Sequence, residues 1–214
     1  MARPQADIEA GRRLLLETIE TMIQERGAIE LSMTELATAA GMSPSNVYRF
    51  FESKEAVMEA VAEDWFADKI QVMEEVVASD GPAKEKMLSF FGRRFVLMKT
   101  RFDEDPDLFV NYCALGSQHL EVIRGYIDLG DHYLAMIVAD AMDQGHFPGL
   151  SIDDTVSLIN QMVQPYCNPD MLPQMGPRLS EEKLGTIIDA IFFGLKGSGK
   201  KQVGKSKPDM QLVS

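Results

Sequence analysis

The sequence has few cysteines and no long apolar run. Its 214 residues include two cysteines, Cys113 and Cys167, which fit neither a disulfide framework nor a metal site. No apolar run reaches the roughly 18–20 residues that a membrane-spanning helix needs. The first residues, MARPQADIEAGRRLLLET, mix acidic with basic side chains and lack the apolar segment of a signal peptide. We therefore expect a cytoplasmic protein with reduced thiols and no membrane partner.

The motifs of common enzymes and metal sites are also missing. The sequence has no Gly-rich phosphate loop, and residues 103–107 lack the Gly and the terminal Glu of a calcium loop. Cys113 and His119 are the nearest thiol and imidazole, but six residues place them about 240° apart around a helix. Asp128 and His132 share a helix face without a second ligand pair, which favours a surface ion pair. We predict no catalytic residue, metal or cofactor; an enzyme or carrier that uses the helical region stays an alternative.

Basic residues are scarce, with 21 Lys and Arg against 33 Asp and Glu and a net charge of -12. The excess of acid is uneven. Residues 1–54 have a net charge of -2, residues 55–195 of -14 and residues 196–214 of +4. A DNA-binding surface in the first region needs only a local basic face, because acidic groups beyond a Debye length of about 8 Å repel phosphates weakly.

Nearly every segment repeats its apolar residues with the period of a helix, and no strand-like alternation is found. We predict an all-α protein of about nine helices. We divide the chain into a first helical domain at residues 1–54, a larger helical domain at residues 55–195 and a flexible Lys-rich tail at residues 196–214. The predicted helices are 7–25, a short one from Ser32 to Gly41, one opened by Ser43-Pro44, then 54–77, 83–100, 106–116, 119–144, 152–164 and 180–195, with a proline-rich connector at 165–177.

Serine and glycine mark the helix ends around residues 27–54. Ser32-Met33-Thr34-Glu35 has the pattern of a capping box, in which the serine hydroxyl and the glutamate each satisfy a backbone N–H. Ser43 precedes Pro44, a residue favoured at the first helical position, and Ser53 precedes the long fourth helix. Gly27 stands where a left-handed helix end is expected. Two short helices joined across residues 41–43 predict a helix-turn-helix, whose second helix enters the DNA major groove.

The second helix of this motif has an apolar and a polar side. Val47, Phe50 and Phe51 are spaced to anchor it, with Phe50 at the edge. Side chains on the other side carry hydroxyl, amide and guanidinium groups that read base edges, whereas Tyr48, Thr34 and Lys54 suit phosphates. Either Ser45 or Asn46 is also suited to phosphate. The predicted DNA-binding residues are Thr34, Pro44, Ser45, Asn46, Tyr48, Arg49 and Lys54.

Residues 12–57 resemble the DNA-binding domain of the TetR (tetracycline-repressor-like) family of bacterial transcriptional regulators. The matching elements are Gly27, Ser32-Met33-Thr34-Glu35-Leu36-Ala37, Ala40-Gly41-Met42-Ser43, Val47-Tyr48, Phe51 and Lys54-Glu55. Ser45 replaces a common Gly, and Phe50 replaces a common His or Tyr, so a phosphate contact from position 50 is not expected. About a quarter of the chain carries this match; the rest fits only in architecture.

The resemblance implies a homodimer that binds a palindromic operator near a promoter and acts as a repressor. It also implies that residues 1–54 are a helix-turn-helix DNA-binding domain and that residues 55–195 are a helical ligand-binding and dimerisation domain. In such proteins the last two helices of each subunit form a four-helix interface. A small apolar or amphipathic effector enters between the fourth and seventh helices, tilts the fourth and moves the two recognition helices apart. An activator that binds DNA without a small ligand is the alternative.

Residues for these further roles are proposed from composition alone. Aromatic side chains with a few polar tips are the usual lining of a ligand site, although each also suits plain core packing. The predicted effector-binding residues are Trp65, Phe66, Phe91, Phe95, Phe109, Tyr112, His119 and Tyr126. The predicted dimer interface comprises Leu158, Met162, Ile187, Ile188, Ile191, Phe192 and Leu195.

Overall fold

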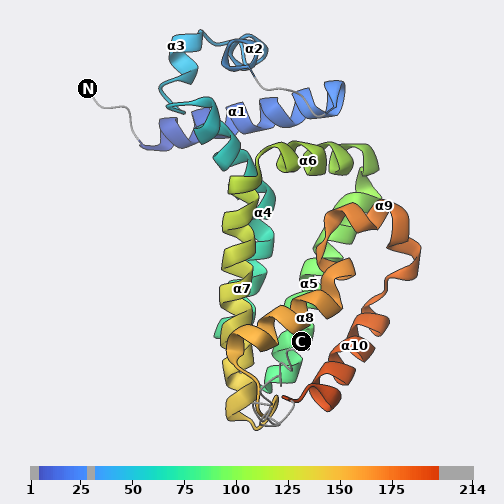
Figure 1. The fold of residues 1–214 in the computed structure, drawn as a ribbon. Helices are drawn as coiled ribbons and strands as arrows, with labels where there is room; N and C mark the ends of the chain where they lie inside the picture. The colour runs from blue at the N-terminus through green and yellow to red at the C-terminus, as the bar shows by residue number, and fades with distance from the viewer. Residues whose placement is uncertain (1–4, 28–31, 198–214) are drawn as a thin grey trace, which may run out of the picture.

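The computed structural model describes residues 5–27 and 32–197, and every regular element among them is a helix (Figure 1). The all-α prediction is confirmed. The helices are α1 Gln5–Arg26, α2 Met33–Ala39, α3 Pro44–Val47, α4 Lys54–Ala78, α5 Ala83–Glu104, α6 Pro106–Gln118, α7 Leu120–Asp143, α8 Ile152–Cys167, α9 Leu172–Met175 and α10 Glu181–Gly194, with 3₁₀ turns at Pro169–Met171 and Gly176–Arg178.

The main difference from the predicted boundaries lies in the proline-rich connector. α8 continues through Pro165 to Cys167 instead of ending at 164. A proline in the last turn removes only one backbone hydrogen bond, so the helix continues past it. The connector then folds into α9 and the two 3₁₀ turns, short helical segments that prolines at their first positions favour.

Helix ends agree with the serine and glycine pattern in part. The Ser53 hydroxyl accepts a hydrogen bond from the Ala56 N–H at 3.1 Å, and Gly27 has a φ of +78°. Ser32 is the N-cap residue of α2, as predicted. The predicted side-chain bond of the capping box is wrong, because the Ser32 hydroxyl accepts no hydrogen bond from the first turn. Its carbonyl accepts from the Leu36 N–H at 2.9 Å, so backbone contacts alone begin this helix. The Ser43 hydroxyl likewise does not cap α3.

Two apolar cores organise the chain. We call α1, α2 and α3, with the turn after α3 that carries Phe50 and Phe51, the head, and α4 to α10 the body. The head's core extends into the body, because Val57 and Val61 of α4 and Leu115 of α6 belong to it. Its members from the head are Leu15, Ile19, Met22, Ile23, Met33, Leu36, Ala37, Val47, Phe50 and Phe51.

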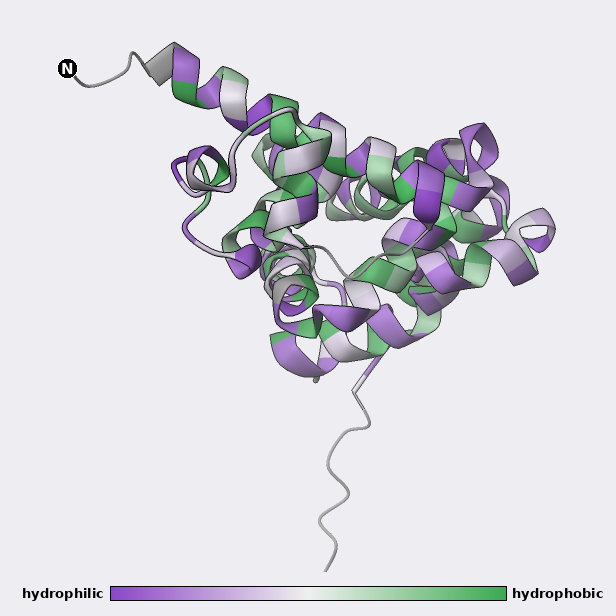
Figure 2. Ribbon diagram, turned by 90° about the horizontal axis from the view of Figure 1, so that it is seen from above, coloured by the Kyte–Doolittle hydropathy of each residue, from purple (hydrophilic) through white to green (hydrophobic). Residues whose placement is uncertain are grey.

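The body packs α4, α5 and α7 along one another and places α8 and α10 over α5 (Figure 1). Hydrophobic and hydrophilic residues alternate along each helix in Figure 2, as expected of helices that each bury one face. No helix within residues 5–27 and 32–197 has the length and apolar character needed to cross a bilayer. Most of the predicted tail, 198–214, lies outside the described residues.

Candidate functional site

The turn between α2 and α3 is fixed by backbone contacts. Gly41 has a φ of +64°, a left-handed conformation that favours glycine, and the Met42 N–H donates to the Ala37 carbonyl at 2.8 Å. The chain then enters α3, where Val47 is fully buried in the head's core. With Val47 held inside, the neighbouring side chains of α3 lie on the outer side of the motif.

The seven residues predicted to contact DNA are all accessible on this motif or beside it. Tyr48 is 51% exposed, which is unusual for a large aromatic residue in a well-packed segment. The Ser45 hydroxyl lies 3.0 Å from that of Ser43. Contact with DNA itself stays a prediction. Thr34, Pro44, Ser45, Tyr48 and Arg49 are exposed, and Asn46 and Lys54 are partly exposed.

The second helix of the motif tightens at its end. α3 ends at Val47, but the Tyr48 N–H still donates to the Pro44 carbonyl at 3.2 Å. The Arg49 N–H bonds only three residues back, to the Asn46 carbonyl at 3.1 Å, as in a 3₁₀ turn. The direction of the Arg49 side chain is therefore set by a tight turn rather than by a regular helix.

Two residues of α1 that the pattern analysis missed hold the end of this turn. The Arg12 guanidinium donates to the Phe50 carbonyl at 3.0 Å and lies 4.3 Å from the centre of the Phe51 ring. A Cβ at Gly11 would come within 2.3 Å of the Phe50 ring, so only glycine allows this close approach. A glycine inside a helix is itself unfavourable, and that was the available signal in the sequence.

Lys54 stands at the N-terminal end of α4, where free backbone N–H groups favour an anion. The carboxylate of Glu55 already lies at this end. Its pKa is below the ordinary value, because its backbone N–H and the Ser53 hydroxyl stabilise the charged form. A DNA phosphate that reaches Lys54 therefore meets a carboxylate beside it.

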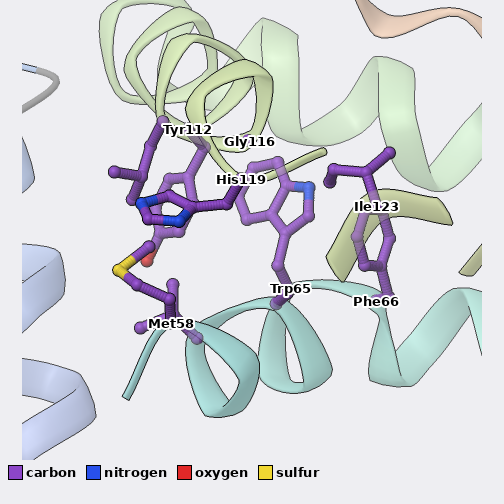
Figure 3. Close-up of a pocket in the computed structure, with 10 residues that line it drawn as sticks. Met58, Trp65, Phe66, Tyr112, Gly116, His119 and Ile123 are labelled. Atoms are coloured by element: carbon purple, nitrogen blue, oxygen red, sulfur yellow. The ribbon is translucent and has the colours of Figure 1, made fainter. Parts of the chain in front are cut away.

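A cavity of about 30 Å³ lies between α4 and the adjoining ends of α6 and α7 (Figure 3). It is far smaller than the roughly 300–1,000 Å³ of most ligand sites. Four of the predicted effector residues line it: Trp65, Phe66, Tyr112 and His119. The remaining lining residues are Met58, Val61, Ala62, Leu115, Gly116 and Ile123, of which sequence reasoning named none.

Two stacked aromatic pairs each place at least one ring in the cavity wall. Trp65 stacks on Tyr112 with ring centroids 4.1 Å apart, and Phe66 stacks on Tyr126 at 3.9 Å. Burial raises the pKa of the Tyr112 and Tyr126 hydroxyls, so both stay protonated. Phe91, Phe95 and Phe109 are 2% exposed in the body's core and, like Tyr126, do not line the cavity.

The cavity shares its walls with the head. Met58, Val61 and Leu115 line it and also belong to the head's core. The amide of Asn111 on α6 adds a polar link, because it donates to the Ile23 carbonyl of α1 at 3.4 Å. A ligand that widens the cavity therefore has to move residues on which α1 to α3 pack.

A second, open groove of about 830 Å³ runs between α5 and α10. Glu85, Glu181 and Glu182 line it with several apolar residues, and none of the predicted effector residues takes part. It shares no residue with the head's core, so its occupation would not move α1 to α3 directly.

The structure corrects part of the predicted dimer interface. Ile188 and Ile191 are 1% and 2% exposed and lie in the body's own core, because the apolar stripe of α10 faces α5. They are not available to a second copy. Phe193, which was not among the predicted interface residues, is 88% exposed on the opposite side of α10. The other predicted interface residues, Leu158, Met162, Ile187, Phe192 and Leu195, are partly or well exposed.

No cluster of metal-binding side chains forms in the part of the chain that the structure describes. Within the described part of the chain, no three His, Cys, Asp or Glu side chains come close enough to hold an ion. Cys113 is half-buried, and burial raises the pKa of its thiol to about 12, which makes it a poor nucleophile near neutral pH.

Two curated family models match separate parts of the chain. Residues 15–61, which contain α2, α3 and most of α1, match bacterial regulatory proteins of the tetR family. Residues 83–188, which run from α5 into α10, match the tetracyclin repressor-like C-terminal domain.

Similar proteins agree with these matches. An uncharacterised HTH-type transcriptional regulator in the dhlA 5'region of Xanthobacter autotrophicus is 25% identical over 179 residues, which cover 83% of this chain and 88% of that protein. FadR from Bacillus subtilis, solved in complex with stearoyl-CoA, has a TM-score of 0.60 and 18% identity over 85% of this chain and 98% of its own. SmeT, the repressor of a Stenotrophomonas maltophilia multidrug efflux pump, has a TM-score of 0.66 and 16% identity over 86% and 90%. The chain belongs to the TetR family of bacterial transcriptional regulators.

Proposed function

We propose that the protein is a cytoplasmic repressor that binds a palindromic operator as a homodimer and is released from it by a small apolar or amphipathic effector. The observation that carries this proposal is the cavity whose walls are shared with the head's core. The cavity is the candidate ligand site, and the side chains of its wall pack directly against the core that supports the candidate DNA-binding surface.

On the DNA side, the roles follow from side-chain chemistry and exposure. Arg49 and Asn46 carry the forked donors and the amide that distinguish base edges. Tyr48 and Lys54 reach phosphates, which set position but not sequence. Two copies of the head are needed for a palindrome, because each α3 reads one half-site.

For the homodimer, we assign the outer faces of α8 and α10. Met162 on α8 is 42% exposed and Phe193 on α10 is 88% exposed, so both leave apolar surface that a two-fold contact would cover. Phe193→Ser should raise the dimer dissociation constant, measured by sedimentation. Unchanged self-association would remove α10 from the interface.

For the effector, the change has to begin at the stacked pairs. An apolar chain that enters the cavity parts Trp65 from Tyr112 and shifts α4 against α6. Since Met58 and Val61 move with α4, the head moves too, and the spacing of two recognition helices changes. The ligand must prefer the shifted state for DNA to be released. Acyl-CoA thioesters are the first class to screen, because a structural neighbour holds stearoyl-CoA.

The test is a fluorescence anisotropy titration of the purified protein against DNA that flanks its own gene, from low salt to about 150 mM. We expect nanomolar binding that depends on sequence and persists at the higher salt. Addition of an effector from the screen should release the DNA. Weak binding that ignores sequence at every salt would contradict the proposal.

One observation favours the alternative, a DNA-binding activator without a small ligand. The cavity of about 30 Å³ holds no effector as it stands. The two functions differ in one measurement: an activator of this kind keeps its DNA affinity across the whole screen.

A further inference from the structure

Lys69, Arg94 and Arg101 lie near one another in the body, and the first two have no carboxylate partner among the described residues. Lys69 on α4 is 6% exposed. Arg94 and Arg101 on α5 are partly buried, and Arg101 pairs with Asp68 at 3.1 Å. Among residues 5–27 and 32–197, neither Lys69 nor Arg94 forms an ion pair.

Aromatic rings surround the two unpaired cations. The Lys69 ammonium lies 5.2 Å from the centre of the Trp65 ring and 5.4 Å from that of Phe66. The Arg94 guanidinium donates to the Tyr126 hydroxyl at 2.9 Å, and its Nε is buried without a hydrogen-bond partner. Rings and a neutral hydroxyl stabilise these charges less than a carboxylate would.

This arrangement is costly and therefore informative. A buried charge is normally paired, because its lost hydration is otherwise not replaced. Residues 55–195 carry a net charge of -14, yet no acid lies against Lys69 or Arg94 other than the Asp68 already bound to Arg101. Burial and then the nearby Arg101 lower the pKa of Lys69 to about 8, so it still carries its charge at neutral pH. Within the described part of the chain, no carboxylate is left to pair with either cation.

We propose that Lys69 and Arg94 bind the acid group of the effector, which is an alkyl chain that ends in a carboxylate or a phosphate. This rests on the proposed function only in taking the cavity as the effector site. Trp65 and Phe66 line that cavity and also lie beside the Lys69 ammonium. A chain that lies among these rings brings its acid group to the two cations.

The aromatic stacks explain how the acid group gains access. Phe66 stacks on Tyr126, and Tyr126 is the hydroxyl to which Arg94 donates. When the chain parts this stack, Arg94 loses a neutral acceptor and gains an ionised one. Opening of the cavity and binding of the anion are thus one event.

The chain offers its own reporter for the test. Trp65 is the single tryptophan, so selectively excited tryptophan fluorescence reports on this site alone. The probes are octanoate, dodecanoate and hexadecanoate, the matching primary alcohols, dodecyl phosphate and dodecanoyl-CoA. We expect the carboxylates to bind about tenfold or more tightly than their alcohols. Dodecyl phosphate and dodecanoate differ mainly in the acid group, so their relative affinity shows whether the site prefers a phosphate or a carboxylate.

Variants separate binding of the acid from packing. Lys69→Met should reduce the preference for acid over alcohol to less than about threefold, and Lys69→Arg should keep it. Lys99→Met is the matched control, because Lys99 is a lysine on α5 that pairs with Asp103 and lies outside the site. The preference should also decline as pH rises through about 8 in the wild type and not in Lys69→Met. The groups that act on the Lys69 ammonium are Arg101, Asp68, Arg94 and Cys113.

Three outcomes would overturn the proposal. These are equal affinity for acids and alcohols, no saturable change in Trp65 fluorescence with any probe, and dodecanoyl-CoA or dodecanoate binding that Lys69→Met leaves unchanged. DNA binding is measured separately by anisotropy. Release of the operator by a neutral ligand would overturn the proposed acid site but support the proposed regulator. Selective binding of acids without operator binding would support the acid site but contradict the proposed regulator.

Discussion

The head and the body place their polar groups in opposite ways. In the head, the buried residues are apolar, and the hydroxyl, amide and guanidinium groups lie outside on α3 and its flanks. In the body, Lys69 and Arg94 lie among aromatic rings without an acid to pair with, while the acidic residues lie mostly on the surface.

The difference reflects what each region binds. DNA is too large to enter a protein of this size, so the head has to present rigid polar groups on its surface, and an apolar core supplies that rigidity. A small amphipathic acid can be enclosed, so the body can hold its recognition groups inside at a cost in stability. Single substitutions should therefore change stability in opposite directions in the two regions.

The largest effect is expected in the head's core. Leu15→Ala removes a side chain that is fully buried, and should lower the free energy of unfolding by about 2–5 kcal/mol. Leu14→Ala is the matched control, because the neighbouring leucine is 45% exposed and should cost less than about 1 kcal/mol. Chemical denaturation measures both. Equal losses would mean that the head is held together by contacts other than this core.

Replacing the buried Lys69 of the body should raise the free energy of unfolding instead of lowering it. Lys69 loses its proton near pH 8 in the folded protein and near 10.5 when unfolded, so between these values the unfolded chain binds more protons and stability rises with pH. Below pH 8 the folded protein carries the full free-energy cost of burying the charged ammonium, and Lys69→Met should stabilise the protein by up to about 3 kcal/mol. The difference between variant and wild type should shrink from pH 8 to 10.5. A constant difference would mean that Lys69 titrates normally.

The sequence predicted the head better than the body for a physical reason. The helix period, the Gly41 turn and the spacing of Val47 and Phe51 are local features, and together they determine which side of α3 is exposed. Ile188 and Ile191 belong to an equally clear apolar stripe, but an apolar stripe in the sequence does not distinguish packing within one subunit from packing against a second subunit. Here it packs on α5.

The charged residues of the body were missed for a related reason. A single lysine or arginine in a long helix is usually on the surface, and Lys69 and Arg94 carry no local signal to the contrary. Their burial follows from how α4, α5 and α7 pack together. The same holds for the small cavity, whose lining comes from three helices.

On the candidate DNA-binding surface, smaller effects should separate two kinds of contact. Arg49→Ala should cost about 1–3 kcal/mol of operator affinity and relax the preference for one base, whereas Lys54→Ala should weaken binding to all sequences and lower the salt slope by about one. Anisotropy titrations with operator and scrambled DNA at several salt concentrations measure both. If the two variants lose affinity equally on every sequence, the division into base and phosphate contacts is wrong.

The smallest effect tests the join between the two regions. Ser53 caps α4, the helix that begins at the head and runs through the body, and Ser53→Ala should cost about 1 kcal/mol because the Ala56 N–H loses its acceptor. Ser32 has the same position on α2 but accepts no such bond, so Ser32→Ala should cost only a few tenths. Thermal unfolding compares the two. A larger loss at Ser32 would mean that its hydroxyl caps α2 in solution, and that the head is held by side-chain caps as well as by its core.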